Sequence, residues 1–321
     1  MLDIPKVLKA ARRKHSTQAA NPLVTVWGEA MDPEHVLGEH PRPQLARDNY
    51  MMLNGLWEYA ITPIHDAARR VTETDQPLTR DEALHAVSHS APPARFDGDI
   101  LVPFSPEAPL SGVKRDLQPN ELLWYRRSFT TPPTDHGKRL LLHCDAVDWA
   151  CACYVNGRLA ATHVGGYLPF TVDITPLLSH DHPADGLATE IMLCVYDPGD
   201  AGTQQRGKQA LCPGGIWYTA QSGIWQSVWC EVVPAAHLIE LTLNGDMHGQ
   251  LRVDARISRA ADVVHTLHLD ITDADGHEAL DERIPINADA HAIHTQITLP
   301  NPHLWSPDDP YLYQVKATLE S

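Results

Sequence analysis

The stretch WACACYVNGRLAATH (residues 149–163) has the pattern of two β-strands joined by a tight turn. The dipeptide Asn156-Gly157 between the two runs is a strong hairpin signal, because both central residues of a type I′ turn need positive φ. Cys151 and Cys153 lie two apart, so they share one face of the first strand and pack there as small apolar residues. We therefore expect an antiparallel hairpin at this point of the chain.

Further short β-prone runs lie on both sides of this hairpin, at 56–61, 124–129, 140–143, 170–174, 191–196 and 225–233. Gly, Pro, Asn and Asp separate the runs, and the 26 prolines of the chain disfavour long helices. Such spacing is typical of a β-sandwich or a jelly roll.

A second series of strand-like runs follows, at 238–243, 250–258, 263–272, 294–299 and 311–319, with a turn signal at Asp275-Gly276. Five or six strands in this length fit an immunoglobulin-like sandwich. No cysteine follows Cys230, so this part must be stable without an intersheet disulfide. The predicted fold class is all-β, a jelly-roll β-sandwich followed by an immunoglobulin-like β-sandwich.

The domain limits follow from shifts in this pattern. We expect an N-terminal extension at 1–20, a jelly-roll domain at 21–234 and an immunoglobulin-like domain at 235–321, with the boundary near Pro234-Ala235-Ala236. Residues 62–99 are polar and have little β pattern, so they form a predicted surface insertion between two strands. Within it, residues 81–89 are expected to form one short helix.

Composition excludes several classes of partner. The formal net charge of −16 argues against nucleic acid, because phosphate binding needs clustered Lys and Arg. No apolar run approaches the ~18–20 residues of a membrane helix. No apolar signal-peptide core follows the basic residues of the first twenty positions. We therefore expect no membrane partner and a cytoplasmic location.

Motifs for metals, cofactors and nucleophiles are missing from the sequence. The six cysteines form no paired C-x2-C set with zinc spacing, and no H-E-x-x-H occurs, so we expect no metal and no other cofactor. No G-x-S-x-G supplies a serine nucleophile, and no alternating βαβ pattern supplies a barrel. The acids Asp145, Asp148, Asp173, Asp197 and Asp200 are interpreted as turn or strand-end carboxylates. We therefore predict no catalytic residue.

Aromatic residues gather near position 220. Trp225 and Trp229 lie four apart in an expected strand, where they share one face and are more often core. Trp217 and Tyr218 follow a Gly-rich segment and are expected in a loop. An aromatic ring on a loop can stack on a sugar or contact another domain, and the sequence leaves plain packing equally open.

Seven short motifs, in order along the chain, resemble glycoside hydrolase family 2, the group that holds β-galactosidases, β-glucuronidases and β-mannosidases. They are NPLVTVWGE at 21–29, RP at 42–43 with LNGLWE at 53–58, VPFSPE at 102–107, WYRR at 124–127, VNG at 155–157 with GGYLPF at 165–170, SGIWQSVW at 222–229, and PHLWSP at 302–307 with PYLY at 310–313.

This resemblance implies a sugar-binding jelly roll followed by an immunoglobulin-like domain. In the family a third domain, a barrel, carries both catalytic glutamates, and no barrel motif occurs here. The resemblance also implies that first-domain loops line the sugar pocket. The matching loops are 102–107 and 214–222, which makes the candidate substrate-binding residues Phe104, Glu107, Trp217, Tyr218 and Gln221. Some relatives carry an acid shortly before the SGI element, and residues 217–221 here contain none.

From this resemblance we expect the chain to be the non-catalytic N-terminal part of a family 2 glycosidase whose parent works by a retaining mechanism. Two alternatives remain open: a free-standing carbohydrate-binding protein, and a structural module without sugar affinity. The expected partners are a carbohydrate, and either the missing catalytic barrel or a second copy of the chain, since a front part alone would expose the apolar surface that met its barrel.

Overall fold

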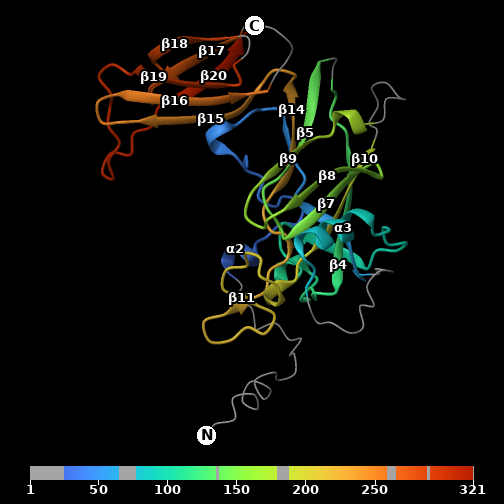
Figure 1. The fold of residues 1–321 in the computed structure, drawn as a ribbon. Coiled ribbons are helices and arrows are strands. Elements are labelled where there is room, and N and C mark those ends of the chain that lie inside the picture. Colours follow the sequence, from blue (N-terminus) through green and yellow to red (C-terminus); the bar gives the residue numbers. More distant parts are fainter. Residues whose placement is uncertain are drawn as a thin grey trace. The chain divides into compact units, whose positions relative to one another are not determined.

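The computed structural model describes residues 25–64, 77–134, 137–178, 188–258, 265–287 and 290–320 (Figure 1). The chain divides into two compact units. The first holds residues up to Pro41, Asn49–Pro133 and Leu140–Glu231. The second holds Arg42–Asp48, Thr134–Arg139 and the residues from Val232 onward. The second unit is therefore assembled from three separated pieces of the sequence.

The first unit is a β-sandwich, as predicted. Its larger sheet is antiparallel and has the strand order β3 (Gly98–Val102), β2 (Gly55–Pro63), β4 (Glu121–Thr130), β10 (Ala188–Tyr196), β7 (Ala150–Val155) and β8 (Arg158–Val164). The smaller sheet has the order β1 (Tyr50–Met52), β14 (Val228–Pro234), β5 (Lys138–Cys144) and β9 (Phe170–Asp173). Both sheets supply fully buried side chains, among them Trp57 and Tyr125 from the larger and Leu142 and Trp229 from the smaller.

The predicted hairpin is confirmed. Strands β7 and β8 pair across a turn in which Asn156 has φ 49° and Gly157 has φ 74°. The Asn156 side chain fixes this turn by donating to the Leu177 carbonyl at 3.1 Å and accepting from the Glu190 amide at 3.0 Å. The Asn-Gly pair thus predicts the hairpin from the sequence, and hydrogen bonds of Asn156 with Leu177 and Glu190 stabilise its turn.

Helix α3 (Arg80–His89) covers the outer face of the larger sheet. The predicted helix is confirmed, and a capping box between Thr79 and Glu82 begins it. Ala83 and Val87 are fully buried in a cluster that includes Trp124 of β4. Because side chains alternate along a strand, Trp124 faces the helix while Tyr125 faces the other way.

A short helix, α2 (Val26–Glu29), lies near the start of the described residues, and the Thr25 side chain caps it by accepting from the Gly28 amide at 3.2 Å. One local expectation is wrong. Trp225 lies outside any strand, between β13 (Gly223–Ile224) and β14, so it does not share a strand face with Trp229.

The second unit is a smaller sandwich of two three-stranded sheets. One has the order β15 (Leu238–Gly245), β16 (Gln250–Ile257) and β19 (Ala292–Thr298), and the other β18 (Glu278–Ile286), β17 (His265–Thr272) and β20 (Gln314–Glu320). Alternate residues of the central strands fill its core, including Val253 and Ile257 from β16 and Leu267 and Ile271 from β17. The predicted turn at Asp275-Gly276 is confirmed, with Gly276 at φ 84°.

Earlier parts of the sequence are bonded into this second unit. The Arg47 side chain donates to the Leu238 carbonyl, and the Ala235 amide donates to the Gly137 carbonyl at 2.9 Å. No helix among the described residues is both long enough and apolar enough to cross a membrane.

Candidate functional site

The two loops singled out in the sequence meet at Glu107. This side chain is only 3% exposed. Its carboxylate accepts from the Leu117 amide at 3.4 Å and from the Ser222 amide at 3.1 Å. Burial raises the pKa of Glu107 to about 8, which these hydrogen bonds oppose. Glu107 therefore links the loop after β3 to the segment that ends at Ser222.

Two further buried carboxylates, those of Asp148 and Asp197, lie near Glu107. Asp197 accepts from the Gly199 amide at 2.8 Å, and hydrogen bonds from Ser222 and Gln204 also reach it. Burial raises the pKa of Asp197 above its ordinary value despite these bonds. The site thus gathers three carboxyl groups where little solvent screens the charge that any of them carries.

Asp148 is the least satisfied member of the group. It lies in β6 (Val147–Asp148) opposite Gly223 and is 3% exposed. Its Oδ1 atom has no hydrogen-bond partner among the described residues. Burial raises the pKa of Asp148, and the charges of Asp197 and Glu107 raise it further. Asp148 therefore has one buried oxygen without a hydrogen-bond donor among the described residues. Its raised pKa favours the neutral carboxylic acid.

Nothing in the sequence separates Asp148 from other strand-end acids. Its carboxylate becomes unusual only through pairing between β6 and β13, which brings residues 148 and 223 together from distant parts of the chain. The one local signal is the repeated glycine at 165–166. A Cβ on Gly166 would lie 2.2 Å from Asp148 Oδ1, so the GGY loop packs directly on this carboxylate.

The Gly166→Ala variant tests this close approach. Because the added methyl meets the buried carboxylate at 2.2 Å, we expect a loss of about 1–3 kcal/mol in the free energy of unfolding. Urea denaturation measures it. Gly38→Ala is the matched control, since a Cβ there meets nothing within 4 Å. Equal stability of the two variants would show that the loop does not rest on Asp148.

Exposed apolar side chains lie on the loops above these acids. Trp217 and Tyr218 are 44% and 71% exposed, Ile216 and Leu168 are more than half exposed, and Tyr167 is 41% exposed. The indole of Trp225 donates to the Gly166 carbonyl at 2.7 Å and stacks edge-on against Tyr167. Both predicted aromatics are therefore on the surface rather than in the core.

Backbone pairing holds the aromatic segment in place. Strand β12 (Tyr218–Thr219) runs parallel to β11 (Gln209–Ala210), and the Trp217 and Gly214 backbones bond to each other at 3.1 and 3.2 Å. Gly215 makes the turn between them with φ 61°, a conformation that favours glycine. Figure 1 shows β11 and α2 at the same end of the first unit.

The other candidate residues lie at the borders of these loops. Phe104 is half-buried, and its amide donates to the Leu101 carbonyl at 2.9 Å. Gln221 is half-buried next to Ser222. The structure thus brings loop 102–107 and the end of loop 214–222 together through Glu107, whereas Trp217 and Tyr218 lie farther out on the surface.

One cluster in the second unit has ligand atoms close enough for a metal: Asp273, Asp275 and His277. The Asp273 carboxylate already accepts from the amides of Asp275 and His277, at 2.9 and 2.8 Å, which closes the turn between β17 and β18. The arrangement is that of an exposed turn capped by its own aspartate.

Known proteins resemble this chain in sequence. The family model described as glycosyl hydrolases family 2 matches residues 236–321. A putative β-glucuronidase of Formosa agariphila is 26% identical over 203 residues, which cover 61% of this chain and 23% of that protein. The β-galactosidase BoGH2A of Bacteroides ovatus is 27% identical over 221 residues, covering 65% of this chain and 24% of that protein. The chain thus spans about a quarter of the length of these relatives.

Solved structures resemble it in fold. The β-glucuronidase of Bifidobacterium dentium, complexed with coumarin-3-O-glucuronide, superposes with a TM-score of 0.59 at 18% identity and covers 86% of this chain and 46% of that one. A β-glucuronidase of Faecalibacterium prausnitzii gives a TM-score of 0.56 at 21% identity, covering 85% of this chain and 45% of that one. The all-β architecture is therefore shared with the parts of these structures that the chain covers.

Proposed function

Because this chain resembles family 2 glycosyl hydrolases in sequence and in fold, we propose that it is the non-catalytic front part of such an enzyme and lends loops to its sugar pocket. The observation that carries this proposal is the aromatic loop surface of the first unit. Trp217 and Tyr218 are exposed on a segment that backbone pairing fixes, which is the property a sugar-stacking wall requires.

The buried acids support a positioning role rather than bond cleavage. A retaining glycosidase needs two carboxyls roughly 5–5.5 Å apart on either side of a bond that the substrate can bring between them. Glu107, Asp148 and Asp197 are each 3% exposed, so a glycosidic bond has no access to them. In this proposal they hold the loops, and the cleaving carboxylates belong to a barrel partner.

The candidate residues then take different roles. Trp217 and Tyr218 face the carbohydrate, Phe104 and Gln221 border it, and Glu107 joins the two loops from below. The domain limits inferred from the sequence, 21–234 with its insertion at 62–99 and 235–321, remain part of this proposal, with the first domain as the sugar-facing one.

Tryptophan fluorescence during titration with β-galactosides and β-glucuronides tests the proposal. We expect weak, saturable quenching, because one wall of a pocket supplies only part of its contacts. Trp217→Ala should weaken this binding by about tenfold, the value of one lost stacking contact near 1.4 kcal/mol. Trp305→Ala, which removes an indole that is 59% exposed in the second unit, is the matched control.

A chromogenic β-glycoside assay on the same sample decides the catalytic part. We expect no turnover above background. Turnover that survives purification and scales with protein concentration would overturn the non-catalytic role. Quenching that is equal in the Trp217 and Trp305 variants would overturn the role of the aromatic loop.

A further inference from the structure

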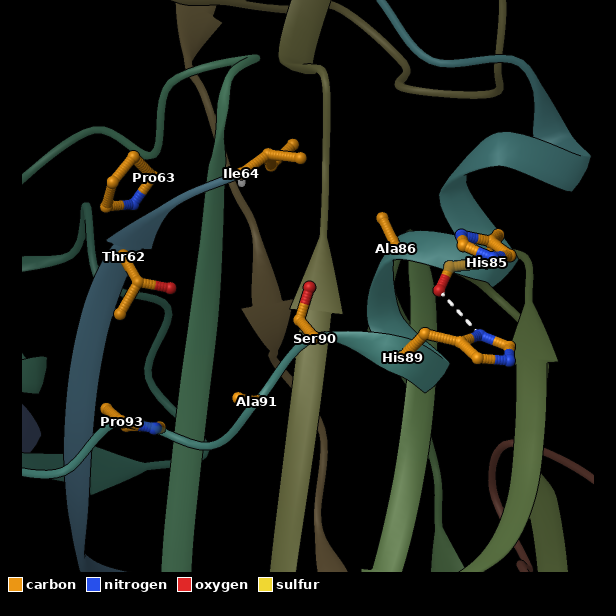
Figure 2. A pocket seen from close by; sticks show the side chains of 9 residues that line it. All are labelled: Thr62, Pro63, Ile64, His85, Ala86, His89, Ser90, Ala91 and Pro93. Carbon is orange, nitrogen blue, oxygen red and sulfur yellow. Dashed lines mark hydrogen bonds between the residues drawn. The ribbon is translucent and has the colours of Figure 1, made fainter. Parts of the chain in front are cut away.

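A pocket of about 420 Å³ lies between the end of β2 and the carboxyl half of α3, with residues 90–93 also in its lining. Its volume falls in the range of roughly 300–1,000 Å³ that small-molecule sites occupy. In Figure 2, Thr62 and Pro63 from the end of β2 and the ring of Pro93 lie on one side. His85 and His89 of α3 lie on the other, with Ser90 between. It shares no residue with the aromatic loops.

The charge around the pocket argues against an anionic ligand. Its lining residues among those that the structure describes include no Lys, Arg, Asp or Glu, and the chain as a whole carries a net charge of −16. The carboxyl end of α3 also points its last carbonyls and its partial negative charge toward this region. The surroundings therefore favour a neutral ligand that is rich in hydrogen-bond donors.

The two histidines form one wall of the pocket, against which a flat ring of a ligand could lie. Their imidazoles stack with centroids 4.2 Å apart and planes inclined by 10°, and His89 Nδ1 lies 3.0 Å from the His85 carbonyl oxygen (Figure 2). That contact fixes the His89 ring, and within the described part of the chain no hydrogen bond involves its Nε2 atom or either ring nitrogen of His85. The rings of Pro63 and Pro93, on the other side of the pocket, are apolar (Figure 2).

Polar groups on the floor complete the site. The Thr62 hydroxyl accepts from the Trp124 indole at 3.1 Å, which holds its oxygen in place and leaves its proton to donate. The Ser90 hydroxyl has no hydrogen-bond partner among the described residues. Flat apolar faces with hydroxyl and imidazole groups at their edges match a pyranose, which has apolar C–H faces and hydroxyls around its rim.

We propose that this pocket is a second binding site, for a neutral saccharide ring, formed by the end of β2, helix α3 and residues 90–93, and separate from the aromatic loops. It does not depend on the role proposed for those loops. The affinity expected for one ring on an open surface is millimolar, because few polar groups converge on it.

Imidazole signals in ¹H–¹⁵N spectra of the whole chain test this site directly. The probes are methyl β-D-glucopyranoside, methyl β-D-galactopyranoside and sodium glucuronate, titrated to 100 mM. We expect saturable shifts of the His85 and His89 signals with a neutral glycoside and none with glucuronate. His85→Ala should weaken the binding by about tenfold through loss of stacking and a hydrogen bond. Asp81→Asn, on an exposed position of the same helix, should leave it unchanged.

Three results would overturn the proposal. One is the absence of any shift with both neutral glycosides. Another is binding of glucuronate as tight as that of the glycosides. The third is loss of the histidine signals with micromolar Zn²⁺ but no response to sugars, which would assign the pair to a metal. His85→Gln, which keeps a polar side chain of similar length, shows whether a loss in the alanine variant reflects the ring or the fold. The Trp217→Ala variant should keep the histidine shifts, so failure of the loop site and failure of this pocket are distinguishable.

Discussion

Replacing Trp124 by alanine lowers the free energy of unfolding by about 3–5 kcal/mol. The side chain is fully buried beneath α3 and has the volume of the largest residue type in the chain. Its removal leaves a cavity that the helix and sheet fill only partly, and the Thr62 hydroxyl loses the indole donor. Since a typical domain is stable by 5–15 kcal/mol, this is a large share of the total.

Urea denaturation followed by far-UV circular dichroism measures this loss. Trp27→Ala is the matched control, because Trp27 is 78% exposed and a surface substitution changes stability by about 0.5 kcal/mol or less. A loss below about 1 kcal/mol for Trp124→Ala would mean that α3 does not pack on the sheet as described. It would also remove one side of the pocket proposed as a second saccharide site.

Replacing Asp148 by asparagine makes the protein less sensitive to alkaline pH. The pKa values of Glu107, Asp148 and Asp197 are all raised in the folded state, that of Glu107 to about 8. A carboxyl with a raised pKa binds its proton more tightly when folded. Its contribution is therefore complete below the unfolded pKa near 4 and is lost as pH rises toward about 8.

For each such carboxyl, the free energy of unfolding falls by at most about 1.4 kcal/mol for every unit that the pH rises within that window. Asparagine removes the charge of Asp148 and also relieves its two neighbours, so the stability of the variant should fall less steeply between pH 5 and 8. The amide should fit, because Asp148 Oδ1 has no partner to lose.

Thermal melts at half-unit pH steps give the two profiles. Asp275→Asn is the control, since that aspartate sits in an exposed turn of the second unit. Parallel profiles for the natural chain and Asp148→Asn would show that the charge of Asp148 does not affect the stability of the folded state or the titration of the other two buried acids. A gain in stability at pH 8 that disappears at pH 5 is the expected signature.

The sequence predicts local elements better than their pairing. The hairpin at Asn156-Gly157 and helix α3 follow from turn and capping chemistry among neighbouring residues, and both are confirmed. In the larger sheet, β10 lies between β4 and β7. This order depends on contacts between distant segments, and the alternation of apolar and polar residues along each strand does not predict which strands pair.

The candidate site shows the same division. The position of Trp217 and Tyr218 on the surface follows from the glycines before them, so a loop could be expected there. The burial of Asp148 could not be expected, because it arises where β6 pairs with β13 and Gly166 of the GGY loop packs on the Asp148 carboxylate. A strand-end aspartate has the same sequence signature whether it ends in solvent or under a loop.

The pieces of the second unit are synthesised at different times. Arg47 and the carbonyl it binds, that of Leu238, are 191 residues apart. At a synthesis rate of about 5–20 residues per second, the first of its pieces leaves the ribosome roughly 10–40 s before its partner exists. During that interval the nascent chain must keep residues 42–48 from settling elsewhere, so a chaperone or slow translation near residue 238 would change the yield of this unit more than that of the first.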